Sequence, residues 1–238
     1  MKRFYAQAGV VHRDDGFVIA LDGKAVRTPG GRTLLIRPLA LAEAVAAEWQ
    51  AQGETVRPET MPLTQLASTA LDRVIPNRAA IIDQLMKYAG TDLLCYWADG
   101  PEDLVLRQER LWQPLVDWVT ETFDVELCVT RGVIPVSQPE ATLSVLADVL
   151  DRYDDTRLTA LQAAVPAMGS LLLGVALVER RLDVEEAFAA SQLDESYQIE
   201  LWGMDAEALR ARESLRNDIA AASLFIDLYV RDGMHLSY

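Results

Sequence analysis

Cysteine and histidine are scarce in this chain of 238 residues, which has two of each. Cys95 and Cys128 belong to no CxxC or Cys/His cluster, so we expect both to be reduced thiols in the core. His12, in a predicted turn, and His235, near the end of the chain, accompany no nucleophile motif. We therefore expect no Ser/His/Asp or Cys/His enzyme, no metal site and no cofactor.

Basic charge is also in short supply. Lys and Arg total 22 against 36 Asp and Glu, which gives a net charge of −14. Nucleic-acid binding requires a large surface that neutralises phosphates, and this balance opposes one. We expect no nucleic-acid partner.

Long apolar runs and targeting segments are missing as well. The most apolar stretch, residues 163–178, is shorter than the roughly 20 residues that cross a bilayer, and Pro166, Gly169 and Gly174 interrupt it. We expect a buried core helix there and no membrane insertion. The first residues form neither an apolar secretory segment nor an Arg/Ser-rich transit segment. A cytoplasmic location is expected.

The opening of the chain has the turn signals of a small antiparallel sheet. Asp22-Gly23 lies between two short apolar runs and predicts a hairpin, because Gly accepts a positive φ. Residues 28–31 predict a second turn and lack the spacing of a phosphate-binding loop. Helical spacing then predicts one helix from Leu39 to Gly53 and another from Pro62 to Pro76, both covering one face of the sheet. We predict a β-rich α+β domain over residues 1–75.

Beyond Pro76 nearly every apolar stretch has helical spacing. The clearest helix is 206–230, where a buried stripe runs through Leu215, Ile219, Ala222, Ile226 and Tyr229. We predict an all-α helical bundle over residues 76–238, and an α+β fold class for the whole chain. The other helices are expected at 79–89, 107–123, 140–153, 157–165, 167–180 and 184–201.

Acidic side chains gather in the helical part. Residues 1–75 hold 9 basic and 8 acidic side chains, about +1, whereas residues 76–238 hold 13 and 28, about −15. Between Leu182 and Leu209 there are eight acids and no basic residue, so no partner nearby in sequence neutralises them. These acids are Asp183, Glu185, Glu186, Asp194, Glu195, Glu200, Asp205 and Glu207.

Trp202 and Gly203 lie inside this acidic stretch and predict a corner between two helices. In one interpretation the corner is purely structural, with Trp202 packed inward and Asp205 at the positive end of the next helix. In the other, an aromatic anchor ringed by acids holds a basic, apolar partner surface. The residues predicted to bind a partner are Trp202, Asp205, Glu207, Asp194, Glu195 and Glu200.

Two other function classes stay open at this point. A hydrolase could draw a general acid and a general base from two carboxylates of residues 183–207, provided that they converge on a cleft. The chain could also be an interaction subunit for some other acceptor. The interpretation that assigns no function to the acids is that they form a solvated helix face.

Ten runs, in this order along the chain, resemble the family of assembly chaperones for the α subunit of the F-type ATP synthase. They are RFY at 3–5, LDGKAVRTP at 21–29, AEWQAQGE at 47–54, TMPLT at 60–64, DLLCY at 92–96, RQ at 107–108, GV at 132–133, GSL at 169–171, LDE at 193–195 and WG at 202–203. No single run is decisive, but their ordered combination is specific.

The resemblance implies a non-enzymatic chaperone with a β-rich N-terminal domain and a helical C-terminal domain. Such a protein keeps newly made α subunit soluble until the β subunit takes over the same surface, in mitochondria or α-proteobacteria. The resemblance also implies an important acid shortly after the Trp-Gly pair, for which Asp205 and Glu207 are the candidates.

Overall fold

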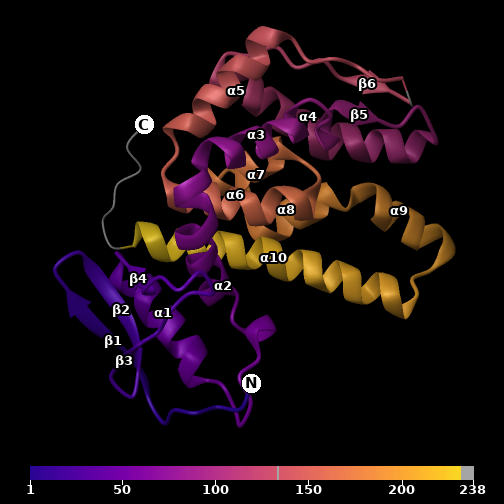
Figure 1. Cartoon of the computed structure of the whole chain (residues 1–238). Coiled ribbons are helices and arrows are strands. Elements are labelled where there is room, and N and C mark those ends of the chain that lie inside the picture. Colours follow the sequence, from indigo (N-terminus) through magenta and orange to yellow (C-terminus); the bar gives the residue numbers. More distant parts are fainter. Residues whose placement is uncertain (133, 232–238) are drawn as a thin grey trace. The chain divides into compact units, whose positions relative to one another are not determined.

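The computed structural model describes residues 1–132 and 134–231, so Val133 and His235 lie outside the described residues (Figure 1). A small antiparallel sheet opens the chain. Strand β1 (Ala8–Arg13) pairs along its whole length with β2 (Gly16–Leu21). The short strands β3 (Lys24–Ala25) and β4 (Leu35–Ile36) both pair with β2, β3 near its end and β4 near its start. His12 belongs to β1 and not to a turn.

The hairpin predicted at Asp22-Gly23 is confirmed. Asp22 has φ +47° and Gly23 has φ +80°, the pair of positive values that suits the right-handed twist of the flanking strands. The Asp22 carboxylate also accepts hydrogen bonds from the backbone N–H groups of Gln7 (2.9 Å) and Ala6 (3.0 Å). These bonds stabilise the ionised form and lower the pKa of Asp22.

Helix α1 (Leu39–Gln50) lies on one face of the sheet, as predicted (Figure 1). Glu48 near its end accepts hydrogen bonds from the backbone N–H groups of Leu63 and Thr64, both at 2.8 Å, and so caps helix α2 (Pro62–Thr69). Burial raises the pKa of Glu48. The helix expected from Pro62 to Pro76 is a succession of helical types: η1 (Pro58–Thr60, 3-10) precedes α2, and η2 (Ala70–Val74, π-helical) and η3 (Ile75–Asn77, 3-10) follow it.

The remainder of the described chain is mainly helical, so the predicted α+β fold class is confirmed. The long final helix has the predicted bounds. The elements are α3 (Arg78–Ala89), η4 (Leu93–Cys95), β5 (Tyr96–Trp97), α4 (Glu102–Phe123), β6 (Thr130–Arg131), α5 (Glu140–Arg152), α6 (Asp155–Met168), α7 (Leu171–Val178), α8 (Val184–Ser191), α9 (Leu193–Trp202) and α10 (Ala206–Val230).

The structure differs from the predicted elements in three places. The helix expected at 184–201 breaks at Gln192 into α8 and α9. The buried stretch 163–178 is two helices, because α6 continues past Pro166 and Gly169 then takes a positive φ of 64°. The parallel strands β5 and β6 were not predicted, because each has only two residues and so shows no alternation of apolar and polar side chains. Within the described ranges, no helix combines the length and apolar character that a bilayer crossing requires.

The structure groups into two compact units. One contains Met1–Arg78, Asp155–Ala160 and the described residues from Leu224 onward, and the other contains Ala79–Asp154 and Leu161–Ser223. The simpler division into residues 1–75 and 76–238 stays a prediction. Both cysteines are free: Cys95 is buried, as expected, and Cys128 is partly exposed.

A fully buried carboxylate organises the core of the second unit. Asp92 accepts hydrogen bonds from the backbone N–H of Leu94 (3.1 Å), the hydroxyl of Ser170 (2.6 Å) and the backbone N–H of Leu172 (3.0 Å). These contacts join η4 to the first turn of α7, a helix in which every residue is buried. Burial raises the pKa of Asp92 to about 6, although the hydrogen bonds act in the opposite direction.

Asp92 should make stability depend on pH. Because the folded state raises its pKa from 3.8 to about 6, the folded protein holds this proton more tightly than the unfolded chain does. The stabilisation from Asp92 is therefore complete below about pH 4 and is lost as the pH rises through about 6, a change on the order of 3 kcal/mol at 1.36 kcal/mol per pKa unit. Asp92→Asn has no carboxyl group to titrate at this position. Urea unfolding should therefore show that the free energy of unfolding of the wild type, relative to this variant, falls between about pH 4 and pH 6. An advantage that stays constant would contradict the prediction.

Candidate functional site

The predicted corner between two helices is present at the end of α9 (Figure 1). Gly203 has φ +83°, a conformation that glycine adopts without strain, and its N–H donates to the carbonyl of Ile199 at 2.8 Å. After Met204 and Asp205 the chain enters α10. The Trp-Gly pair therefore marks a change of direction, as its sequence predicts.

Asp205 forms the N-terminal cap of α10. Its Oδ1 accepts hydrogen bonds from the backbone N–H groups of Glu207 (2.9 Å) and Ala208 (2.8 Å). Those groups have no partner inside the helix, and a carboxylate at the positive end of a helix is favourable. The predicted structural role of Asp205 is confirmed.

Trp202 points to solvent, so the alternative in which it packs inward is wrong. Its exposed fraction is 77%, and that of Leu201 is 56%. Met204 and Leu209 are also exposed. We call these four residues the apolar corner. Sequence analysis singled out Trp202 alone, although Leu201 and Met204 are close neighbours of it and Leu209 falls outside the buried stripe of α10.

The expectation that these acids lack a partner is wrong for Glu185 and Glu200, whose basic partners come from distant parts of the sequence. Glu200 accepts two hydrogen bonds from Arg107 of α4, at 2.7 and 2.9 Å. Glu185 pairs with Arg216 of α10. Both pairs are exposed and contribute little to stability, but they neutralise charge.

Other acids bind local or buried groups. Asp183 and Glu186 form a reciprocal capping box at the start of α8. Asp194 accepts a hydrogen bond of 2.7 Å from Gln108, which is itself buried. Within the described ranges, the exposed side chains of Glu195 and Glu207 make no hydrogen bond or ion pair. The corner therefore carries less unopposed negative charge than the sequence indicates.

The arrangement of these acids does not resemble an acid–base pair. Partial burial raises the pKa of Asp194, as a general acid would require. Its carboxylate, however, is bound by the Gln108 amide, whose oxygen accepts from the backbone N–H of Ala98 at 2.7 Å. Among the residues that the structure describes, no group of three or more His, Cys, Asp or Glu could hold a metal ion.

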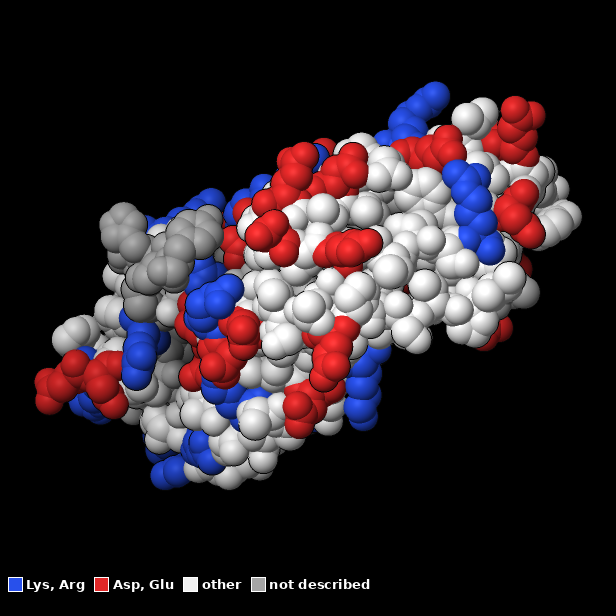
Figure 2. All heavy atoms as spheres, turned by 90° about the horizontal axis from the view of Figure 1, so that it is seen from above, with Lys and Arg blue, Asp and Glu red and all other residues white. Residues whose placement is uncertain are grey.

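Acidic groups are also dispersed over the surface. On the face shown in Figure 2, acidic side chains lie in several groups, with basic side chains and uncharged surface between them. On this face the described acidic side chains thus form separate groups and no single continuous patch (Figure 2).

The two functions that Asp205 could have, capping and charge, can be separated by substitution. Asp205→Ala removes the cap and should lower the free energy of unfolding by about 1 kcal/mol. Asp205→Asn keeps an oxygen acceptor and should stay within a few tenths of a kcal/mol of the wild type. Urea unfolding measures both, with Glu207→Gln as a control that leaves the cap intact. An equal decrease in the free energy of unfolding for the Ala and Asn variants would contradict the capping role.

Comparison with known proteins places this geometry in a family. The family model described as ATP12 chaperone protein matches residues 2–120. The crystal structure of Atp12 from Paracoccus denitrificans has a TM-score of 0.90 and 40% identity, and the match covers 95% of this chain and 97% of that chain. A mutant of the same protein with an aspartate replaced by lysine matches equally well.

More distant relatives agree. A candidate chaperone from Agrobacterium tumefaciens has a TM-score of 0.90 and 37% identity, covering 96% of this chain and 86% of its own. The mitochondrial protein atp12 of Schizosaccharomyces pombe is 24% identical over 236 residues, which are 94% of this chain and 81% of that protein. The chain therefore belongs to the ATP12 chaperone protein family.

Proposed function

We propose that this chain binds the unassembled α subunit of the F-type ATP synthase and keeps it soluble until the β subunit replaces it. The proposed compartment is the bacterial cytoplasm, or the mitochondrial matrix if the chain is a eukaryotic form. Membership in a family of chaperones agrees with the expectation of a non-enzymatic protein, and no relative reported above is named as a hydrolase. The observation that carries the proposal is the apolar corner.

An exposed tryptophan beside other exposed apolar side chains is an unfavourable arrangement for an isolated protein. Water around this surface is released when a partner covers it, and tryptophan is enriched among the residues that dominate binding energy. In a chaperone such a surface can cover the apolar interface that an unassembled subunit exposes. The contact between Glu200 and Arg107 lies on the last turns of α9 and limits fraying of the helix end that carries Trp202.

The acids near the corner fit a role in encounter and release. Glu195 and Glu207 are exposed and unpaired among the described residues, and one oxygen of Asp205 is free of the cap. Exposed charges of this kind speed the approach of a basic surface but add little to final affinity, and salt screens them. A client held in this way can be displaced by a tighter partner without ATP hydrolysis.

The relative with an aspartate changed to lysine bears on how such charges are tested. It retains the fold, since its TM-score to this chain equals that of the unmodified protein, 0.90. A charge reversal of this kind is therefore compatible with folding in this family. Charge variants of Glu195 and Glu207, whose exposed side chains hold no cap, are expected to report on binding rather than on loss of structure.

The experiment is co-expression with the cognate α subunit. The chain should increase the soluble fraction of the α subunit, measured by centrifugation and immunoblotting. Trp202→Ala should lose most of this effect, because a central aromatic anchor contributes about 2 kcal/mol or more to binding, roughly a thirtyfold change in affinity.

Ile134→Ala is the matched control, since Ile134 is 71% exposed and lies outside the apolar corner. It should protect the α subunit as the wild type does. No increase in soluble α subunit with the wild type would overturn the proposed function. An intact effect with Trp202→Ala would move the binding site elsewhere.

A further inference from the structure

The sheet-containing unit has a groove of about 640 Å³ that the apolar corner does not include. Part of its lining comes from polar residues of α2 and η2, from Thr64 to Arg73. Most of the remaining lining is apolar and comes from the turn at 26–30, the end of α1 and residues 56–61. We call this the α2 groove. Its apolar residues include Val26, Pro29, Trp49, Val56, Pro58 and Met61.

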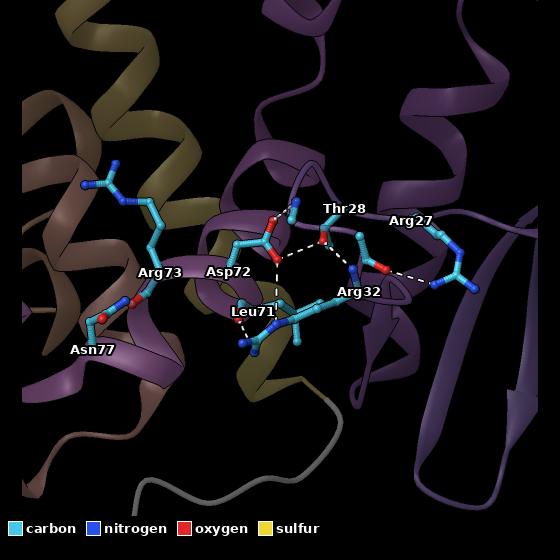
Figure 3. A network of polar contacts seen from close by, with 9 residues as sticks. Arg27, Thr28, Arg32, Leu71, Asp72, Arg73 and Asn77 are labelled. Carbon is cyan, nitrogen blue, oxygen red and sulfur yellow. Dashed lines mark hydrogen bonds and ion pairs between the residues drawn. The ribbon is translucent and has the colours of Figure 1, made fainter.

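The carboxylate of Asp72 in η2 joins the turn at residues 28–30 to the helical side of the α2 groove (Figure 3). One carboxylate oxygen accepts from the Thr28 hydroxyl at 2.8 Å, and the other accepts from the Gly30 N–H at 2.7 Å. Arg32 lies 4.0 Å from the same carboxylate and donates to the carbonyl of Leu71. A Cβ on Gly30 would meet Asp72 at 2.6 Å, so the turn approaches the helix as closely as glycine allows. The turn that lines the groove is therefore fixed before any ligand binds.

Two cations at the α2 groove remain without an acidic partner. Figure 3 shows Arg27 and Arg73 on opposite sides of the contact between Thr28 and Asp72. Arg27 donates to the carbonyl of Gly31 at 2.8 Å, which leaves its charge unopposed. Arg73 makes no side-chain hydrogen bond or ion pair within the described part of the chain, and only its carbonyl is used, by Asn77. The lining thus presents positive charge, with Asp72 already neutralised.

The dimensions of the groove suit an extended peptide. Thr64 and Arg73 are nine residues apart along a nearly continuous helical path, roughly 14 Å at about 1.5 Å per residue. An extended chain covers this length with about four residues. Gln65, Ser68 and Thr69 along this path carry groups that can bond to a peptide backbone. The indole N–H of Trp49, another residue of the lining, is buried and has no acceptor among the residues that the structure describes.

We propose that the α2 groove binds an extended segment of an unassembled client polypeptide, about four residues long, in which an apolar side chain lies next to an aspartate or glutamate. The apolar side chain contacts the apolar lining, and the carboxylate pairs with Arg73 or Arg27. This proposal rests on the proposed function in one respect, which is that the client is the ATP synthase α subunit. It gives the chain a second recognition site, which prefers acidic segments, whereas the apolar corner prefers basic ones.

The test uses an array of overlapping 12-residue peptides that cover the cognate α subunit, blocked at both ends and probed with the full chain. Bound peptides should contain an apolar residue within two positions of an Asp or Glu. Replacing that acid by Asn or Gln should lower the affinity of the peptide at least threefold. Ser68→Trp fills the groove and should lower binding to these peptides at least tenfold, whereas Ser68→Ala should not. Arg73→Gln should lower it about two- to fivefold, in keeping with one exposed charge pair.

The controls separate this inference from the proposed function. Trp202→Ala should leave these peptides bound. The wild type could protect the α subunit while neither Ser68→Trp nor Arg73→Gln lowers the binding of any peptide. In that case the groove proposal is wrong and the proposed function stands. Preference for basic peptides would also overturn the proposal. Arg73→Gln changes an exposed side chain, so the test holds even if Ser68→Trp fails to fold.

Discussion

A row of contacts between α4 and the α8–α9 segment supports everything proposed for the apolar corner. The Trp112 indole donates to the carbonyl of Ala190, Gln108 binds Asp194, and the Tyr197 hydroxyl donates to Asp103. Each such bond contributes on the order of 1 kcal/mol, and the buried members would be costly to leave unpaired. The row follows both helices as far as Tyr197, and the Arg107–Glu200 pair extends it into the last turn of α9. Trp202 is therefore exposed at the end of a helix that is joined to α4 at several points.

The same contacts explain what could be predicted from the sequence. Period and turn signals are local, so they predicted the sheet, the Asp22-Gly23 hairpin, the bounds of α10 and the corner after Trp202. The break at Gln192 carries no Gly or Pro and was missed. Whether an acid is paired depends on residues far away in the sequence, as with Glu200 and Arg107, which are 93 positions apart. Counting charges along the chain could not reveal that Glu185 and Glu200 have basic partners.

The family-like runs contain many residues whose side chains join distant segments. Asp22 binds the segment before β1, Glu48 caps α2, and Asp92 joins η4 to α7. These residues have a structural reason to be where they are, which accounts for much of the resemblance without reference to binding. Trp202 differs, because its side chain is 77% exposed. It is this contrast, rather than membership in a run, on which the proposal of Trp202 as a binding residue rests.

Two recognition surfaces with opposite charge would have a physical advantage for a chaperone that uses no ATP. The apolar corner is edged by acids, whereas the α2 groove is edged by Arg27 and Arg73, so each would select a different kind of client segment. When one client occupies both, the second contact forms at a high effective concentration, and two weak contacts hold it as firmly as one strong contact. Displacement at either surface returns the client to weak binding at the other. A partner subunit that covers only one of the two client segments could thus begin release, which requires no chemical energy.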